Sequence, residues 1–426
     1  MKSFIALFLA VFLIFSFTPP IYALDSSTSN STLPIVHGEG AYLIDVLSGQ
    51  TLFMKNPDEL LAPASTTKIM TGLLAIERGN LQDIVTASST MLNNKLVYGT
   101  MIYLEPGEKM PLQDLLYGTL LKNSANDAAV AIAEYIGGDI PHFVEMMNQR
   151  AHEIGADQTH FSNPSGLTEK EHVTTAHDLA LIARVAYQNP VFAQYVRTKS
   201  TTISRSKENV PKLLVNENKL LWRDSSVDGI KTGYTAAAQN CLVASVTKDG
   251  RQLIGVILKS PGREIYTDME NLFDYGFTQY KSEVYKPAGT AISSITVNNQ
   301  SVDLILDRPL YITQKQGEPQ QTLDLKVSVL GASVLTSVEE GQEVAQVEVL
   351  EGNKHLDTFP LKASRTVQPE TPKLTLSSFY KPWYIALIVI GSLIIVLFNR
   401  NRNSSRYWRR RTRLSKQRKS SYLQDK

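Results

Sequence analysis

The feature that most constrains this chain is a stretch of twenty residues, Phe379–Phe398, in which Lys381 is the only charged residue. An α-helix rises about 1.5 Å per residue, so this stretch would measure about 30 Å, the thickness of a membrane's hydrocarbon core. Tyr380, Trp383 and Tyr384 stand where an interfacial aromatic belt would lie. The stretch is apolar on all sides, which predicts a spanning helix rather than an amphipathic one lying on the surface.

The residues after this helix are strongly basic. From Arg400 to Lys426 there are eleven Lys or Arg residues and one acid, Asp425, so this part carries +10 while the whole chain carries +2. Basic residues beside a spanning helix hold that end in the cytoplasm, which predicts that residues 399–426 form a cytoplasmic tail. A nucleic-acid-binding arm is the less favoured alternative, because the tail adjoins a spanning segment and the rest of the chain carries −8.

The amino-terminal end also carries an apolar run. Lys2 precedes the unbroken run Phe4–Phe15, and Ala23 offers a small residue for cleavage. This order predicts a secretory signal peptide over residues 1–23, followed by a flexible, Ser/Thr-rich leader over 24–34. A buried helix or an uncleaved anchor is the alternative, although twelve apolar residues are few for spanning. We therefore expect a single-pass membrane protein whose body lies outside the cytoplasm.

Between the two apolar runs, the patterns predict an α+β fold. Length alone favours two or three domains. Residues 35–282 begin and end with strands and are helical in the middle, which predicts an antiparallel sheet that joins early to late strands and is flanked by helices. The expected strands are 41–46, 51–54, 228–234, 241–246 and 253–258, and the expected helices are 69–79, 112–121, 127–136 and 177–187.

From residue 286 the pattern changes to short alternating segments with Gly, Asn and Asp turns. The segments 295–297, 302–306, 323–329 and 343–350 predict a small all-β domain over 286–366. Residues 367–378, with two prolines, are then a linker to the membrane helix.

One Ser-x-x-Lys pattern stands out in a helical context. This spacing puts a hydroxyl and an amine one helical turn apart, so an unprotonated lysine can take the serine's proton and activate it as a nucleophile. The pattern occurs four times, beginning at Ser65, Ser204, Ser245 and Ser378. Only Ser65 to Lys68 opens a long apolar helix, where neighbouring apolar residues would lower the lysine pKa. The simpler alternative for Ser65 is a helix N-cap.

Two further short motifs follow in the chain. Ser124 and Asn126 lie on an expected turn between two helices, where a hydroxyl and an amide can project into a cleft. Lys231, Thr232 and Gly233 lie on an expected strand, whose lysine and hydroxyl can bind a carboxylate and whose glycine permits close backbone approach. The order Ser-x-x-Lys, Ser-x-Asn, Lys-Thr-Gly is the motif set of penicillin-binding proteins and serine β-lactamases.

Residues from about 35 to 280 resemble the D-alanyl-D-alanine carboxypeptidases, the low-molecular-mass penicillin-binding proteins. The residues around the three motifs and the stretch Phe161–Leu167 are similar to the corresponding sequences of that family. The β domain and the C-terminal anchor also lie at the positions along the chain where that family has them. The resemblance implies a serine β-lactamase/transpeptidase-like fold and removal of the terminal D-alanine from peptidoglycan stem peptides. β-Lactam antibiotics would act as acylating inhibitors, and the family needs no cofactor. The apolar anchor departs from the amphipathic anchors common in the family.

The resemblance also implies a role for each motif residue. Ser65 would form the acyl-enzyme, with Lys68 as general base and Ser124 as proton relay to the leaving amine. The substrate-binding residues would be Asn126 for the substrate amide, Lys231 and Thr232 for the terminal carboxylate, Gly233, and Tyr234, whose backbone N–H would join that of Ser65 in an oxyanion hole.

The sequence around the other reactive residues favours structural roles for them. Seven histidines include no His-Glu-x-x-His pattern, so no metal site is expected. Cys241 lies in an apolar strand, as a buried structural thiol does. Glu169 and Glu171 follow the Asn163 loop; activation of water is one interpretation, and a solvated loop is the favoured one.

Two other functions remain open from the sequence. A serine β-lactamase would use the same scaffold, although the β domain and anchor favour the carboxypeptidase. A non-catalytic wall-binding or sensor module is disfavoured by the intact Ser65, Lys68 and Lys231.

Overall fold

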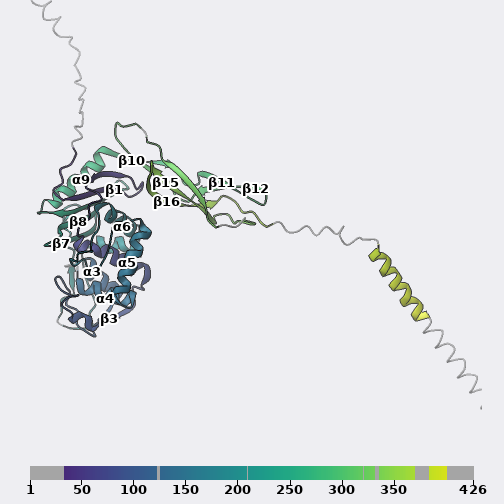
Figure 1. The fold of residues 1–426 in the computed structure, drawn as a ribbon, viewed down its shortest axis with the longest axis horizontal. Coiled ribbons are helices and arrows are strands. Elements are labelled where there is room, and N and C mark those ends of the chain that lie inside the picture. Colours follow the sequence, from purple (N-terminus) through teal and green to yellow (C-terminus); the bar gives the residue numbers. More distant parts are fainter. Residues whose placement is uncertain are drawn as a thin grey trace, which may run out of the picture. The chain divides into compact units, whose positions relative to one another are not determined.

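The computed structural model describes most of the chain between the two apolar ends, and the C-terminal helix (Figure 1). The predicted signal peptide, nearly all of the predicted leader, most of the linker and the basic tail after Arg400 lie outside the described residues. The described ranges are 33–121, 125–208, 210–319, 321–331, 335–369 and 383–400.

The predicted antiparallel sheet is confirmed, and it joins the first strands of the chain to later ones. Its order is β2-β1-β9-β8-β7, so β1 lies between its hairpin partner β2 and the distant β9, where Tyr42 pairs with Val256. The five strands are β1 (Gly40–Asp45), β2 (Thr51–Lys55), β7 (Val227–Thr235), β8 (Gln239–Lys248) and β9 (Arg251–Ser260).

Both faces of this sheet are buried, because alternate side chains of each strand enter different cores. Ala41 and Leu43 pack with α9 (Ile265–Gln279) on one face. Tyr42 and Ile44 pack with the larger helical core on the other face. Helices therefore cover both faces, and the predicted α+β class is confirmed (Figure 1).

The helices of the larger core begin and end close to the expected residues. The Ser65 segment forms a short 3-10 turn, η1 (Ala64–Thr67), that runs directly into α2 (Lys68–Arg78), which ends at Gly79 as expected. Helices α5, α7 and α9 were not among the expected elements. The remaining helices of this core are α3 (Leu112–Leu120), α4 (Asn126–Gly137), α5 (Ile140–Ile154), α6 (Ala176–Gln188) and α7 (Pro190–Arg197).

Short elements connect these helices. They are β3 (Ile84–Thr86) paired with β4 (Lys109–Pro111), the 3-10 turn η2 (Ser89–Leu92), β5 (Ser200–Thr202) paired with β6 (Leu213–Val215), and α8 (Leu220–Arg223).

The predicted β-rich segment is confirmed and contains more strands than the alternation indicated. β10 pairs with β13, and a five-stranded sheet has the order β11-β12-β16-β15-β14. The strands are β10 (Tyr280–Lys286), β11 (Ala291–Val297), β12 (Gln300–Leu306), β13 (Leu310–Lys315), β14 (Asp324–Val329), β15 (Glu343–Glu351) and β16 (Lys354–Ala363).

By contacts, the chain divides into two compact units. Of the described residues, the first unit holds those within 33–295, 303–331 and 341–364, and the second holds 296–302, 335–340, 365–369 and 383–400. Within the second unit, Val367 is buried and pairs with Val338, although 367 is the first residue of the predicted linker. The remaining predicted domain boundaries stay a prediction.

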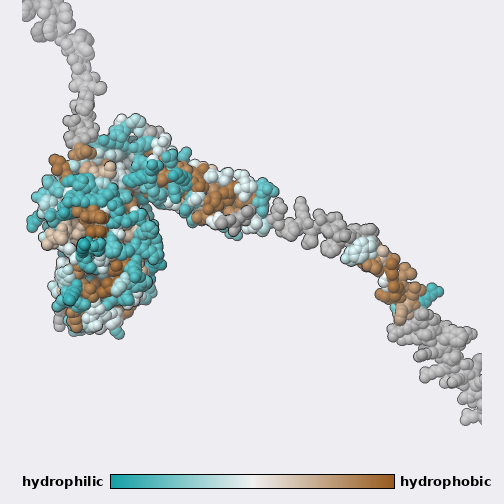
Figure 2. All heavy atoms as spheres, viewed as in Figure 1, coloured by the Kyte–Doolittle hydropathy of each residue, from teal (hydrophilic) through white to brown (hydrophobic). Residues whose placement is uncertain are grey.

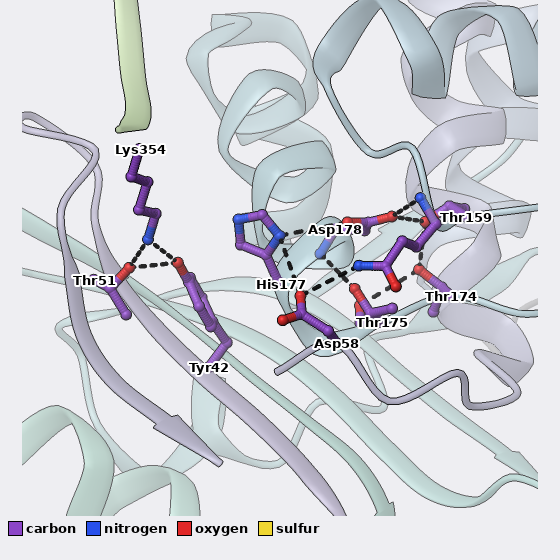
Figure 3. A network of polar contacts seen from close by, with 10 residues as sticks. Tyr42, Thr51, Asp58, Thr159, Thr174, Thr175, His177, Asp178 and Lys354 are labelled. Atoms are coloured by element: carbon purple, nitrogen blue, oxygen red, sulfur yellow. Dashed lines mark hydrogen bonds and ion pairs between the residues drawn. The ribbon is translucent and has the colours of Figure 1, made fainter. Parts of the chain in front are cut away.

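Polar contacts tie β16 to the first hairpin within the first unit. The Lys354 ammonium donates to the hydroxyls of Tyr42 (2.8 Å) and Thr51 (Figure 3). Nearby, Asp178 of α6 accepts from the Thr159 hydroxyl at 2.9 Å. Arg184, also on α6, donates to the Leu356 carbonyl and the Asp357 carboxylate.

A helix of eighteen residues, Trp383–Arg400, is long and apolar enough to cross a membrane, with a mean hydropathy of 2.0. Its surface is apolar along most of its length (Figure 2). It overlaps the predicted span over most of its length and ends two residues later, while residues 379–382 lie outside the described residues. The apolar C-terminal helix is therefore confirmed as a candidate membrane anchor.

Candidate active site

The Ser65 hydroxyl and the Lys68 amine meet at the start of α2. Lys68 Nζ lies 3.1 Å from Ser65 Oγ, because the 3-10 turn η1 brings residue i and residue i+3 to the same side of the chain. Ser65 is partly exposed, whereas Lys68 is fully buried. Neither η1 nor α2 has a side-chain N-cap bond, and their N-cap residues are Pro63 and Thr67, so Ser65 is not an N-cap.

Lys68 is held by three hydrogen-bond partners, two of which come from distant parts of the chain. Its Nζ donates to Ser65 Oγ, to Asn126 Oδ1 at 2.7 Å and to the Ser165 carbonyl. The Asn126 amide is itself oriented, since its Nδ2 donates to the Tyr98 carbonyl at 2.6 Å. The amine is therefore fixed on the nucleophile with little rotational freedom.

The surroundings of Lys68 favour its neutral form. Burial lowers its pKa well below the ordinary value of 10.5, and the positive charge of Lys231 lowers it further. Asp127 and Glu217 act in the opposite direction. A lowered pKa increases the fraction of neutral amine, and a neutral amine can accept a proton from a serine hydroxyl, which is the chemistry of a general base.

The loop that supplies the Ser165 carbonyl is organised by Asn163. Asn163 Oδ1 accepts from the backbone N–H groups of Ser165, Gly166 and Leu167. Gly166 has φ +83°, and a Cβ there would lie 1.9 Å from the Ala64 carbonyl oxygen. Only glycine therefore lets this loop approach the residue before the nucleophile.

Strand β7 forms the opposite wall and approaches Ser65 through Gly233. A Cβ on Gly233 would lie 2.9 Å from the Ser65 backbone nitrogen, so a side chain at this position would displace the strand from η1. Lys231, two residues earlier, is buried, and its Nζ donates to the Thr232 carbonyl at 3.1 Å. Burial lowers its pKa to about 8, and Glu217 partly offsets that effect.

These walls enclose a cleft of about 280 Å³. Ser65 lies on one side and β7 on the other. The described lining residues are Ser65, Thr100, Glu217, Thr232, Gly233, Tyr234, Asn240, Cys241, Leu242, Ile265 and Tyr266.

The structure brings together seven of the eight residues expected at the site from sequence. Ser65, Lys68 and Asn126 are joined by hydrogen bonds, and Lys231, Thr232, Gly233 and Tyr234 are consecutive on β7 beside them. Ser124 lies outside the described residues.

Ser165 and Glu217 are further site residues that sequence reasoning missed. The Gly-containing turn Ser162–Gly166 was a signal for the first, and nothing in the sequence pattern marks the second.

The other reactive residues lie in environments that do not support a catalytic role. Burial raises the pKa of the Cys241 thiol to about 12, which keeps it protonated. His172 accepts at Nδ1 from the Ser162 N–H, so its Nε2 carries the proton and donates to the Thr67 hydroxyl, and burial lowers its pKa to about 4. Glu169 accepts from Asn163 Nδ2 at 2.8 Å and does not line the cleft, while Glu171 is exposed.

A serine in contact with a buried lysine of lowered pKa, facing a second buried lysine on a strand, defines the class of serine enzymes that work through acyl transfer. The comparisons with known proteins place the chain within that class. A family model described as D-alanyl-D-alanine carboxypeptidase matches residues 27–262. A second, described as penicillin-binding protein 5, C-terminal domain, matches residues 280–369.

Individual relatives agree with these matches. D-alanyl-D-alanine carboxypeptidase DacF of Bacillus subtilis is 31% identical over 86% of this chain and 95% of its own length. The crystal structure of penicillin-binding protein 5 from Haemophilus influenzae has a TM-score of 0.62 at 28% identity, covering 79% of this chain and 98% of that one. The Streptomyces K15 DD-transpeptidase has a TM-score of 0.54 at 30% identity, covering 58% and 99%.

The chain belongs to the D-alanyl-D-alanine carboxypeptidase family of serine peptidases. The predicted resemblance and the predicted serine-type carboxypeptidase are thereby confirmed, in preference to the β-lactamase and the non-catalytic alternatives.

Proposed function

We propose that this protein removes the terminal D-alanine from peptidoglycan stem pentapeptides through an acyl-enzyme on Ser65. The observation that carries the proposal is the 3.1 Å contact between Ser65 Oγ and the Lys68 amine, whose pKa burial lowers. Ser65 Oγ attacks the carbonyl carbon between the two D-alanines while Lys68 Nζ takes its proton. The C–N bond then breaks, and the leaving D-alanine amine receives a proton.

The second half of the reaction restores the enzyme. Lys68, again neutral, takes a proton from water as the water oxygen attacks the Ser65 ester. The ester C–O bond breaks and releases the shortened peptide, and Lys68 returns the proton to Ser65 Oγ. In this proposal Ser124 relays the proton to the leaving amine, as expected from the motif, and Asn126 holds the substrate amide. The hydrogen bond from Asn126 Nδ2 to the Tyr98 carbonyl supports a fixed orientation for that side chain.

Residues of β7 bind the terminal carboxylate of the substrate, and backbone N–H groups stabilise the oxyanion. Lys231 and Thr232 bind the terminal carboxylate, an arrangement supported by the cleft that Thr232 lines beside Ser65. The backbone N–H groups of Ser65 and Tyr234 stabilise the oxyanion of the tetrahedral intermediate, a contribution of several kcal/mol in enzymes of this kind. The approach of Gly233 to the Ser65 nitrogen supports this placement.

The location follows from the two apolar ends of the chain. The helix Trp383–Arg400 anchors the protein, the signal peptide over 1–23 exports the body, and the basic tail 399–426 stays in the cytoplasm. The peptidase domain then meets its stem-peptide substrate on the outer side of the membrane, where β-lactam antibiotics also acylate Ser65.

The pH dependence of kcat/KM is expected to be bell-shaped. Activity falls at low pH as Lys68 becomes protonated and can no longer act as a base. It falls again as the pH rises through about 8, because Lys231 loses the charge that binds the terminal carboxylate. An Arg stays charged well above pH 10, so Lys231→Arg should move the alkaline limb up by at least about one pH unit. An unchanged alkaline limb in that variant would assign the limb to another group.

The test of the proposed function is intact-protein mass spectrometry after incubation with labelled penicillin, with the modified serine located by peptide mapping. We expect one long-lived penicilloyl adduct, on Ser65, and rapid release of D-alanine from a stem pentapeptide. Rapid penicillin turnover without D-alanine release would instead support a β-lactamase, and an adduct on another serine would reject the Ser65 assignment.

A further inference from the structure

Glu217 is the one charged residue among the described residues that line the cleft. The other lining residues, from Ser65 and Thr100 to Tyr266, carry no charge at neutral pH. Lys68 and Lys231 are buried beneath the surface of the site. An exposed carboxylate in a cleft proposed to bind a carboxylate-terminated peptide calls for a physical reason.

The backbone at Glu217 is fixed by the two buried asparagines that flank it. Asn216 Nδ2 donates to the carbonyls of Val196 (3.2 Å) and Thr198 (3.1 Å). Asn216 Oδ1 accepts from the Asn218 N–H at 2.9 Å, and Asn218 Oδ1 accepts from the Leu220 N–H at 3.1 Å. The segment between β6 and α8 therefore holds Glu217 at the cleft on a rigid support.

The Glu217 carboxylate forms no close ion pair with any residue in the described part of the chain, and at longer range its charge raises the pKa values of the buried Lys68 and Lys231. The nearby cations Lys219 and Arg223 lie over the Tyr266 ring, at 5.8 and 5.3 Å from its centroid. Burial raises the pKa of Tyr266, and the negative charge of Glu217 raises it further. The carboxylate charge therefore acts on a residue that lines the same cleft.

The leaving residue of the substrate occupies this cleft under the proposed function. If Lys231 and Thr232 bind the terminal carboxylate, the side chain of that last D-residue lies in the space that Thr232 shares with Glu217 and Tyr266. A carboxylate there attracts a cationic side chain and repels an acidic one, and the partial exclusion of water strengthens both effects.

We propose that Glu217 is a specificity-determining residue: among leaving D-amino acids with long side chains, it favours a cationic side chain over a neutral one of the same length and disfavours an acidic one. The inference rests on the proposed carboxypeptidase function and names the preferred substrate class of the same site. Peptides ending in D-lysine are then better substrates than peptides ending in D-norleucine, which has the same aliphatic chain without the amine, and peptides ending in D-glutamate are the poorest.

The first test measures the full-length protein in detergent with diacetyl-L-lysyl-D-alanyl peptides that end in D-alanine, D-lysine, D-norleucine or D-glutamate. Release of the last residue gives kcat/KM for each. We expect D-lysine to exceed D-norleucine by about five-fold, the upper range for a pair of charges near a surface. Equal values for D-lysine and D-norleucine in the wild-type protein would overturn the proposal without any variant.

Two substitutions then assign the preference to this side chain. Glu217→Gln should bring the ratio of D-lysine to D-norleucine close to one, and Glu217→Lys should make D-glutamate the better substrate. Glu145→Gln is the matched control, since Glu145 is an exposed acid on α5 that does not line the cleft, and it should keep the wild-type ratio. A preference for D-lysine that survives in Glu217→Gln would place its origin elsewhere.

Different results would contradict the Glu217 preference and the carboxypeptidase activity. If D-alanine is released but the D-lysine preference is absent, the inference about Glu217 is wrong and the proposed function stands. If no peptide loses its last residue and Ser65 is not acylated by penicillin, the proposed function fails, and the Glu217 proposal fails with it.

Discussion

Replacing Ser65 with alanine is expected to abolish both the release of D-alanine and the covalent labelling by penicillin. Removing the nucleophile of a serine enzyme lowers kcat by about 10⁴-fold or more, because the remaining groups can bind the substrate but cannot form the acyl-enzyme. The alanine leaves the fold intact, since Ser65 is partly exposed and caps no helix. D-Alanine release from a pentapeptide and the mass of the protein after labelled penicillin measure the two effects.

The chain offers a matched control for this variant. Ser204 begins a second Ser-x-x-Lys pattern, but it is exposed, lies outside the regular helices and does not line the cleft. Ser204→Ala should keep wild-type rates and a wild-type penicillin adduct. Persistent labelling in Ser65→Ala would show that another residue is the nucleophile.

Replacing Lys68 with methionine is expected to slow acylation by about 10³-fold, within the range for removal of a general base. Methionine nearly matches the length and volume of lysine and is apolar, so it suits the buried position of Lys68. The second-order rate of penicillin acylation isolates this step from the later hydrolysis. The Ser65 hydroxyl remains, so a slow adduct on the same serine should still form.

The same variant should also lose stability by a measurable amount. Asn126 Oδ1 and the Ser165 carbonyl lose their common donor, and each unsatisfied buried acceptor costs about 1–3 kcal/mol. Thermal unfolding measures this loss and shows whether the variant is folded at the assay temperature. Lys207→Met is the control, because Lys207 belongs to the exposed Ser204 pattern and pairs with Glu105 at the surface. Wild-type acylation by a folded Lys68→Met would reject the general-base role.

Local patterns were sufficient to predict the elements that carry the motifs. Ser65 and Lys68 are three residues apart, so a single helical turn determines their contact, and the apolar spacing after them predicts α2. Lys231 to Gly233 lie in a stretch of strand character that the structure places in β7. The pairing of β1 with β9 followed from the order of strands and helices along the chain.

Contacts between distant residues were harder to predict. The Ser165 carbonyl reaches Lys68 across ninety-seven residues, through a turn whose geometry depends on Asn163 and on the close approach of Gly166 to Ala64. Helix α9 has mixed polar and apolar residues, and only its packing on the sheet shows which side chains it buries. No local period encodes such contacts.

The sequence by itself determined the family, the order of the three motifs and the apolar ends, because each depends on residue type and on spacing over a few residues. Only the tertiary structure decided that Lys68 is buried within reach of the charge of a second buried lysine, Lys231, and that Glu217 lines the cleft. Burial and electrostatic fields depend on every group that the fold brings near, so the neighbours of Lys68 along the chain predicted the direction of its pKa shift but not the effects of Lys231, Asp127 and Glu217.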